Sequence, residues 1–176
     1  MRYKEKPSKF TWESMGDIKV GRGNLGSDMP VMVYRLMQYT MRDILHREYD
    51  EETARNILWA AGHLAGINFA ENVLDLSGDF DFFVANLHKS LIDYKIGILR
   101  IERSDLDSLN FTLTVSEDLD CSGLPITDET VCDYDEGFIS GIFETYTGKE
   151  FNVKEIDCWA TGDRTCRFKA RPSVQV

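Results

Sequence analysis

The sequence has few basic residues and no long apolar run, and both absences narrow the classes of protein to consider. Its 20 lysines and arginines are outnumbered by 30 aspartates and glutamates, which gives a formal net charge of −10. Binding to nucleic acid phosphates, or to an anionic membrane surface, needs a basic stripe, and the sequence has none. No apolar run approaches the ~18 residues that a membrane span needs. We therefore expect neither a nucleic acid partner nor insertion into a membrane.

The N-terminus also lacks the apolar core of a signal peptide, because residues 1–6 lead into polar sequence. We therefore expect a cytoplasmic protein. Internal repeats, low-complexity segments and a clear linker are missing as well, and 176 residues with 43% hydrophobic content suit one domain with its own core. We predict an N-terminal extension with short strands over residues 1–28, including a brief strand at Asp17–Val20, and a single domain over residues 29–171.

Helical periodicity begins at Pro30. Apolar residues recur there at spacings of three and four, which predicts an amphipathic helix with Asp28 as its N-cap. Further helices are predicted after Asp50, from Phe80 to Tyr94 and from Val131 to Thr147. Pairs of glycines four residues apart in two of these helices favour close packing over a pocket wall. The apolar stripe of the first helix and the glycine pairs are Val33, Leu36, Met37, Met41, Ile44, Leu45, Gly62, Gly66, Gly137 and Gly141.

Period-two alternation predicts strands at Ile96–Glu102 and Phe111–Val115, and two more strands that turn around Gly162. The two pairs of strands and the helices between them indicate an α+β fold, an antiparallel sheet packed with helices.

Only four cysteines are present, and three of them gather around the last predicted hairpin. If the hairpin turns at Gly162, Cys158 and Cys166 face each other across the strands, close enough for both thiolates to bind one ion. Glu155 joins them if its strand bulges, and Cys132 comes from the start of a helix. Zinc accepts such mixed sulfur and oxygen ligands. The residues alone leave a Cys158–Cys166 disulfide and inert buried thiols open as alternatives, and Cys121, in a turn-rich stretch, is interpreted as a spare thiol.

The cysteine and glycine motifs resemble the 4-vinyl reductase (4VR) domain, and the resemblance extends over residues 20–170. The strongest part runs through Val131-Cys132, Glu136 to Gly141, Glu155 to Cys158 and Gly162 to Phe168. The resemblance implies a ligand-binding fold shared with the sensor domains of aromatic-responsive activators and with TRAPP tethering subunits, commonly dimerised through helices. It also implies a structural zinc held by Cys132, Glu155, Cys158 and Cys166, a set that fills the tetrahedron and leaves no open position.

Three functions follow as hypotheses. The first is a homodimeric small-molecule-binding or sensory module for a hydrophobic or aromatic ligand, with Trp59, His63 and Phe83 as candidate pocket residues. The second is a reductase that acts on a vinyl group of a tetrapyrrole-like substrate, which needs a hydride source that the sequence does not indicate. The third is an interaction scaffold of the tethering-subunit type. We expect the binding module and no catalytic residues, and the phenol specificity of the aromatic sensors is not carried over.

Overall fold

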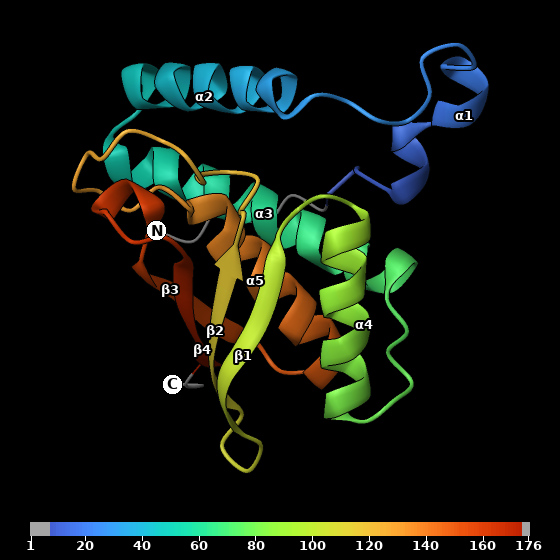
Figure 1. The fold of residues 1–176 in the computed structure, drawn as a ribbon, viewed down its shortest axis with the longest axis vertical. Coiled ribbons are helices and arrows are strands. Elements are labelled where there is room, and N and C mark those ends of the chain that lie inside the picture. Colours follow the sequence, from blue (N-terminus) through green and yellow to red (C-terminus); the bar gives the residue numbers. More distant parts are fainter. Residues whose placement is uncertain (1–7, 174–176) are drawn as a thin grey trace.

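The computed structural model describes residues 8–173 and has one four-stranded sheet with helices on it (Figure 1). The strands pair antiparallel in the order β1-β2-β4-β3. No helix among the described residues is both long enough and apolar enough to cross a membrane. The elements are η1 (Trp12–Met15), α1 (Ile18–Gly21), α2 (Val31–Glu48), α3 (Glu51–Val73), α4 (Phe80–Asp93), β1 (Ile98–Asp105), β2 (Asn110–Ser116), α5 (Asp133–Thr147), β3 (Phe151–Asp157), η2 (Trp159–Thr161) and β4 (Cys166–Pro172).

Helix α5 lies between the sheet and α3, and the paired glycines explain how closely the two helices approach. A Cβ atom on Gly62 would lie 1.9 Å from the carbonyl oxygen of Tyr134, and one on Gly137 would lie 2.0 Å from that of Trp59. No side chain fits at such distances, so only glycine allows this backbone contact. The packing interpretation of the glycine pairs is therefore confirmed.

Most of the predicted elements are present with small shifts at their ends. Asp50 caps α3, since its side chain accepts a hydrogen bond from the N–H of Thr53. The inward residues of α4, among them Phe83 and Leu87, are buried in the core. The chain leaves α5 at Gly148, whose φ of 69° is left-handed and ends the helix as predicted.

Two predictions near the N-terminus are wrong. Asp17–Val20 does not form a strand: the Asp17 side chain accepts from the N–H of Val20 and starts the single helical turn α1. In the described part of the 1–28 extension, residues 8–28, there is no strand. Helix α2 begins after Pro30 rather than at an Asp28 cap, because a proline holds the residue before it in an extended conformation. The division at residues 28 and 29 stays a prediction.

Helix α2 presents its polar side to the protein and its apolar side to solvent. Tyr34, Arg35 and Arg42 on the inner side reach the segment between β2 and α5. On the outer side, Met32 is 79% exposed and Leu36 is 65% exposed. The helix is amphipathic as predicted, but most of its apolar stripe has no partner among the described residues of the chain.

Candidate functional site

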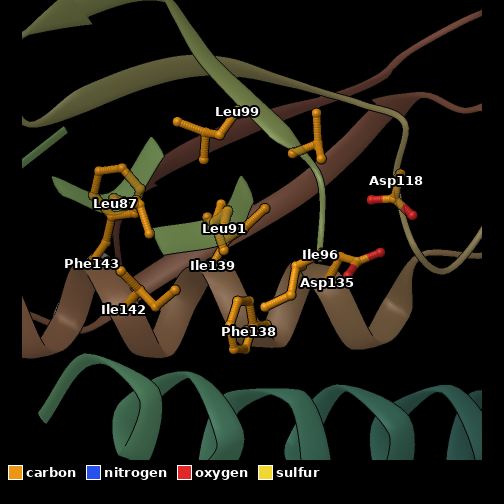
Figure 2. Close-up of a pocket in the computed structure, with 11 residues that line it drawn as sticks. Leu87, Leu91, Ile96, Leu99, Asp118, Asp135, Phe138, Ile139, Ile142 and Phe143 are labelled. Carbon is orange, nitrogen blue, oxygen red and sulfur yellow. The ribbon is translucent and has the colours of Figure 1, made fainter. Parts of the chain in front are cut away.

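An apolar cavity lies between α4, α5 and the sheet (Figure 2). Its volume of about 20 Å³ is enough for one water molecule. Leucines of α4 and β1 form one wall, and Phe138, Ile139, Ile142 and Phe143 of α5 form the other. Asp118 and Asp135 line one end, and Figure 2 shows their carboxylates on the same side of the cavity. The cavity is therefore apolar along its length, with acidic residues at one end.

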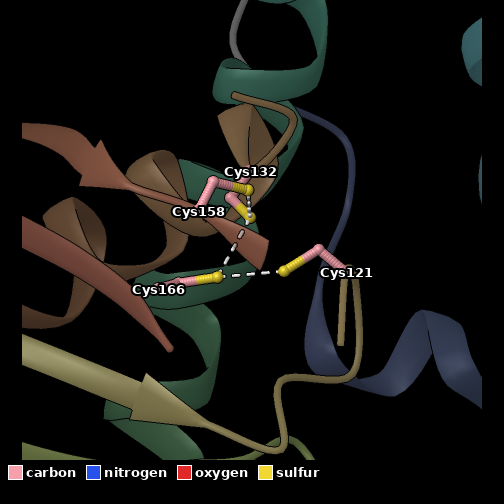
Figure 3. Close-up of side chains that lie close together, drawn as sticks. All are labelled: Cys121, Cys132, Cys158 and Cys166. Atoms are coloured by element: carbon pink, nitrogen blue, oxygen red, sulfur yellow. Dashed lines mark hydrogen bonds between the residues drawn. The ribbon is translucent and has the colours of Figure 1, made fainter. Parts of the chain in front are cut away.

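The four cysteines gather beyond the acidic end of α5 (Figure 3). All four are free thiols, 0–1% exposed, and their sulfur atoms lie within 4.8 Å of one another. The Sγ of Cys132 is 3.8 Å from that of Cys158 and 3.8 Å from that of Cys166. Sulfur ligands at ~2.3 Å from a tetrahedral zinc are about 3.8 Å apart. These three cysteines therefore already have the spacing of a zinc site.

Different segments bring the cysteines together. Cys132 precedes α5, Cys158 follows β3, and Cys166 begins β4. The last residue pair of the β3–β4 ladder is Asp157 with Arg167, so the hairpin places Cys158 and Cys166 at the same end, as predicted. The connection is longer than a tight turn, because η2 lies within it and Gly162 ends η2 with φ 99°.

Cys121 lies in this cluster, although no pattern in the sequence indicates that position. Its Sγ is 2.9 Å from that of Cys166, closer than two ligands of one tetrahedral zinc. The segment that carries it folds back over the hairpin, because the indole N–H of Trp159 donates to the carbonyl of Leu124 and the N–H of Thr127 donates to that of Ala160. Long-range hydrogen bonds of this kind leave no short motif in a sequence.

Glu155 lies beside the cluster and is 4% exposed. The ladder shifts register between Glu155 and Asp157, the bulge that the sequence analysis required. The Oε2 of Glu155 accepts from the backbone N–H of Cys132 at 3.3 Å, while Oε1 has no hydrogen-bond partner among the described residues. A buried carboxylate oxygen without a partner is costly. This oxygen is therefore suited to bind a cation beside the thiols.

The charges of the cluster are shared among its members. Hydrogen bonds between thiols, those of Cys121 foremost, lower the pKa of Cys158 far below the usual range and raise the pKa values of Cys132 and Cys166. Burial, and then the nearby Cys158, raises the pKa of Glu155 to about 8. The cluster thus favours a thiolate at Cys158, the form in which cysteine binds a metal.

The three residues predicted for the pocket do not line the cavity. Trp59 and His63 stack on each other on α3, with ring centroids 4.9 Å apart, and His63 Nε2 is 2.6 Å from Glu144 Oε2. Phe83 is fully buried and meets Phe143, which does line the cavity, edge to face. The side chains that sequence reasoning missed are those of α5, whose apolar spacing is the same for any core helix.

Comparison with known proteins finds two relatives in Methanocaldococcus jannaschii. The protein MJ1642 is 24% identical over 155 residues, which cover 84% of this chain and 80% of the relative. The protein MJ0855 is 24% identical over 178 residues, which cover 100% of this chain and 68% of the relative.

Three solved structures share the fold. A vinyl-4-reductase family protein from M. jannaschii has a TM-score of 0.62 at 16% identity, over 95% of this chain and 99% of that one. The phenol-responsive sensory domain of the transcription activator PoxR, solved with phenol, has a TM-score of 0.62 at 17% identity, over 84% and 78%. A trafficking protein particle complex subunit 3 from Naegleria fowleri, covalently bound to palmitic acid, has a TM-score of 0.65 at 11% identity, over 83% and 96%.

The predicted α+β fold, shared with aromatic-sensor domains and tethering subunits, is therefore confirmed. The family model of the vinyl-4-reductase (4VR) domain matches residues 111–172, a range that contains all four cysteines and Glu155. With this match and the fold of a vinyl-4-reductase family protein, the resemblance to the 4-vinyl reductase domain is confirmed, and residues 111–172 of the chain carry a 4VR domain.

Proposed function

We propose that this protein is a small-molecule-binding, sensory-type module for a hydrophobic or aromatic ligand, braced by a structural zinc. The observation that carries the proposal is the position of α5. One side of this helix forms the wall of the apolar cavity, and its first turn follows directly on Cys132. Similar folds hold phenol in the PoxR sensory domain and palmitic acid in the trafficking subunit. Enclosed apolar cavities with a few polar groups are typical of ligand sites.

The zinc would be held by Cys132, Cys158 and Cys166, with Glu155 as the fourth ligand. The 3.8 Å spacings around Cys132 and the unpartnered Oε1 of Glu155 support this set. Cys121 is the alternative fourth ligand, but it lies too close to Cys166 for the spacing of a tetrahedral site. When bound, zinc supplies a rigid cross-link between α5 and the β3–β4 hairpin. Four protein ligands leave it no open position, and we assign no catalytic residue.

A cavity of about 20 Å³ must widen to admit an aromatic ring. Binding would then favour a state in which α4 and α5 lie further apart, and ligand affinity would depend on the cost of opening that state. Phe83, one of the predicted pocket residues, supports this wall through Phe143. Trp59 and His63 lie on α3 and hold the outer side of α5 in this proposal.

The unpartnered apolar side of α2 supports a homodimer. Its exposed residues share one side of an 18-residue helix, and a two-fold axis lets such a stripe pack against its own copy. The inner side of the same helix bonds to the segment that carries Cys121 and leads to Cys132. A dimer built on α2 could therefore report a change at the binding site to a separate partner.

Ligand binding can be tested by thermal unfolding of the purified protein with phenol, toluene and indole. We expect at least one aromatic compound to raise the midpoint, and Ile142→Trp, which fills the cavity, to abolish that rise. His63→Ala is the control and should keep it, since His63 does not line the cavity. No stabilisation by any apolar compound would contradict the binding module and favour the scaffold. Oxidation of a reduced nicotinamide with a vinyl-bearing tetrapyrrole would favour the reductase.

A further inference from the structure

A second group of possible metal ligands lies next to the cysteines, formed by Asp118, Cys132 and Asp135. Their ligand atoms lie within 4.8 Å of one another, and the residues are 3%, 1% and 8% exposed. Asp118 comes just after β2, and Asp135 lies in the first turn of α5. Ordered elements on both sides therefore hold the three groups in place.

The two carboxylates have no basic partner. Within residues 8–173, no lysine, arginine or histidine nitrogen lies within 4.0 Å of the side-chain oxygens of Asp118 or Asp135. The nearby Arg35 donates instead to the carbonyl of Asp118, and Arg42 binds Asp133. Two like charges buried together without a counter-charge are strongly unfavourable. The pair thus needs a cation or a shared proton.

Hydrogen bonding inside the chain leaves ligand oxygens free. Asp118 accepts the backbone N–H groups of Asp120 and Cys121 through Oδ1. Asp135 Oδ2 is buried and has no hydrogen-bond partner in the described part of the chain. Asp120 is different, because the hydroxyl of Tyr34 donates to its Oδ1. Asp118 and Asp135, with the thiol of Cys132, are therefore the groups that remain for a ligand.

The zinc of the cysteine centre cannot serve these carboxylates, since its four positions are filled in the proposed function, on which this inference rests. We propose that Asp118, Cys132 and Asp135 form a second cation site, bridged to the cysteine centre by the Cys132 thiolate. Two carboxylates and one shared thiolate suit a borderline divalent ion such as Zn²⁺. Three protein ligands leave one position open, at the end of the cavity that the same two aspartates line.

The test is the zinc content of the full chain after equilibration with excess Zn²⁺ and removal of loosely bound metal by gel filtration, measured by elemental analysis and native mass spectrometry. We expect two zinc ions per chain in the wild type and one in both Asp135→Asn and Asp118→Asn, substitutions that keep the side-chain shape. Asp107→Asn, in the exposed β1–β2 turn, is the matched control and should keep two.

One zinc per chain in the wild type would overturn the second site and leave the cysteine centre in place, with the aspartates sharing a proton. Two ions that persist in both aspartate variants would also overturn it, because the second ion would then lie elsewhere. No zinc at all would contradict the cysteine centre itself, so the two proposals fail in different ways. If neither variant keeps its circular dichroism, the wild-type count decides: two ions support the site and one overturns it.

Discussion

At the scale of single residues, the cysteine centre explains why polar and ionisable groups are tolerated deep in the protein. Cys158 is completely buried, and its thiolate is stabilised by the thiols around it. A metal replaces those protons and links segments that hydrogen bonds alone hold together. The stability of residues 111–172 should therefore depend on metal more than on any single apolar contact.

We expect Cys158→Ser to lose zinc and to lower the free energy of unfolding by several kcal/mol, because metal binding is coupled to folding. Zinc content and denaturant unfolding measure the two effects. Ser122→Ala, at a half-buried position next to Cys121, is the control and should change neither. Full zinc occupancy in Cys158→Ser would exclude Cys158 as a ligand.

A second pair of variants identifies the fourth ligand. Glu155→Gln should weaken zinc binding about 10–100-fold, the loss typical for a group that supports a metal site, and Cys121→Ser should retain the metal. Competition with a chromophoric chelator measures both affinities. The reverse pattern would assign the fourth position to Cys121, which lies 2.9 Å from Cys166.

The sequence predicts the local part of this centre and misses the distant part. Cys158, Cys166 and Glu155 belong to one hairpin, whose strand period places them at one end. Cys121 reaches the same place only through the path of the segment after β2, and Asp118 comes with it. Strand period says nothing about such a path, because hydrogen bonds to residues some 35 positions away determine it.

At the scale of elements, the contact between α3 and α5 determines where the cavity wall lies. Backbone carbonyls of each helix touch glycines of the other, which leaves α5 no room to shift towards α3. A ligand that enlarges the cavity must therefore displace α4 or the sheet.

We expect Gly137→Ala to lower stability by about 1–3 kcal/mol, the cost of overpacking a core, because the new Cβ would lie 2.0 Å from the carbonyl oxygen of Trp59. Chemical denaturation measures the change. Gly21→Ala, where no atom lies within 4 Å of the new Cβ, should be neutral or slightly stabilising. Equal effects of the two substitutions would show that the helices separate at no cost.

The direction in which α2 faces could not be predicted from its sequence. Apolar spacing gives the period of a helix and the width of its stripe, but not which side meets the chain. Here the polar side docks, because Tyr34, Arg35 and Arg42 find carbonyl and carboxylate acceptors on the segment between β2 and α5. Those acceptors are more than 80 positions away in the sequence, so no local pattern could indicate them.

At the scale of the whole molecule, we expect a dimer in solution with twice the 20.2 kDa chain mass. Leu36→Glu should convert it to a monomer, since a carboxylate would be buried in the apolar interface. Light scattering coupled to gel filtration measures both masses. Ala85→Glu, at an exposed position on α4, is the matched control and should stay dimeric. A monomeric wild type would contradict the homodimer.

The outward apolar side of α2 also links the stability of one chain to its neighbours. A helix that docks through hydrogen bonds to the protein, and through apolar contacts to a second copy, is fully stabilised only when that copy is present. Association then adds to folding by mass action. The temperature at which the protein unfolds should in that case rise with its concentration, so that the amount of protein present decides how firmly α2 covers the metal centre.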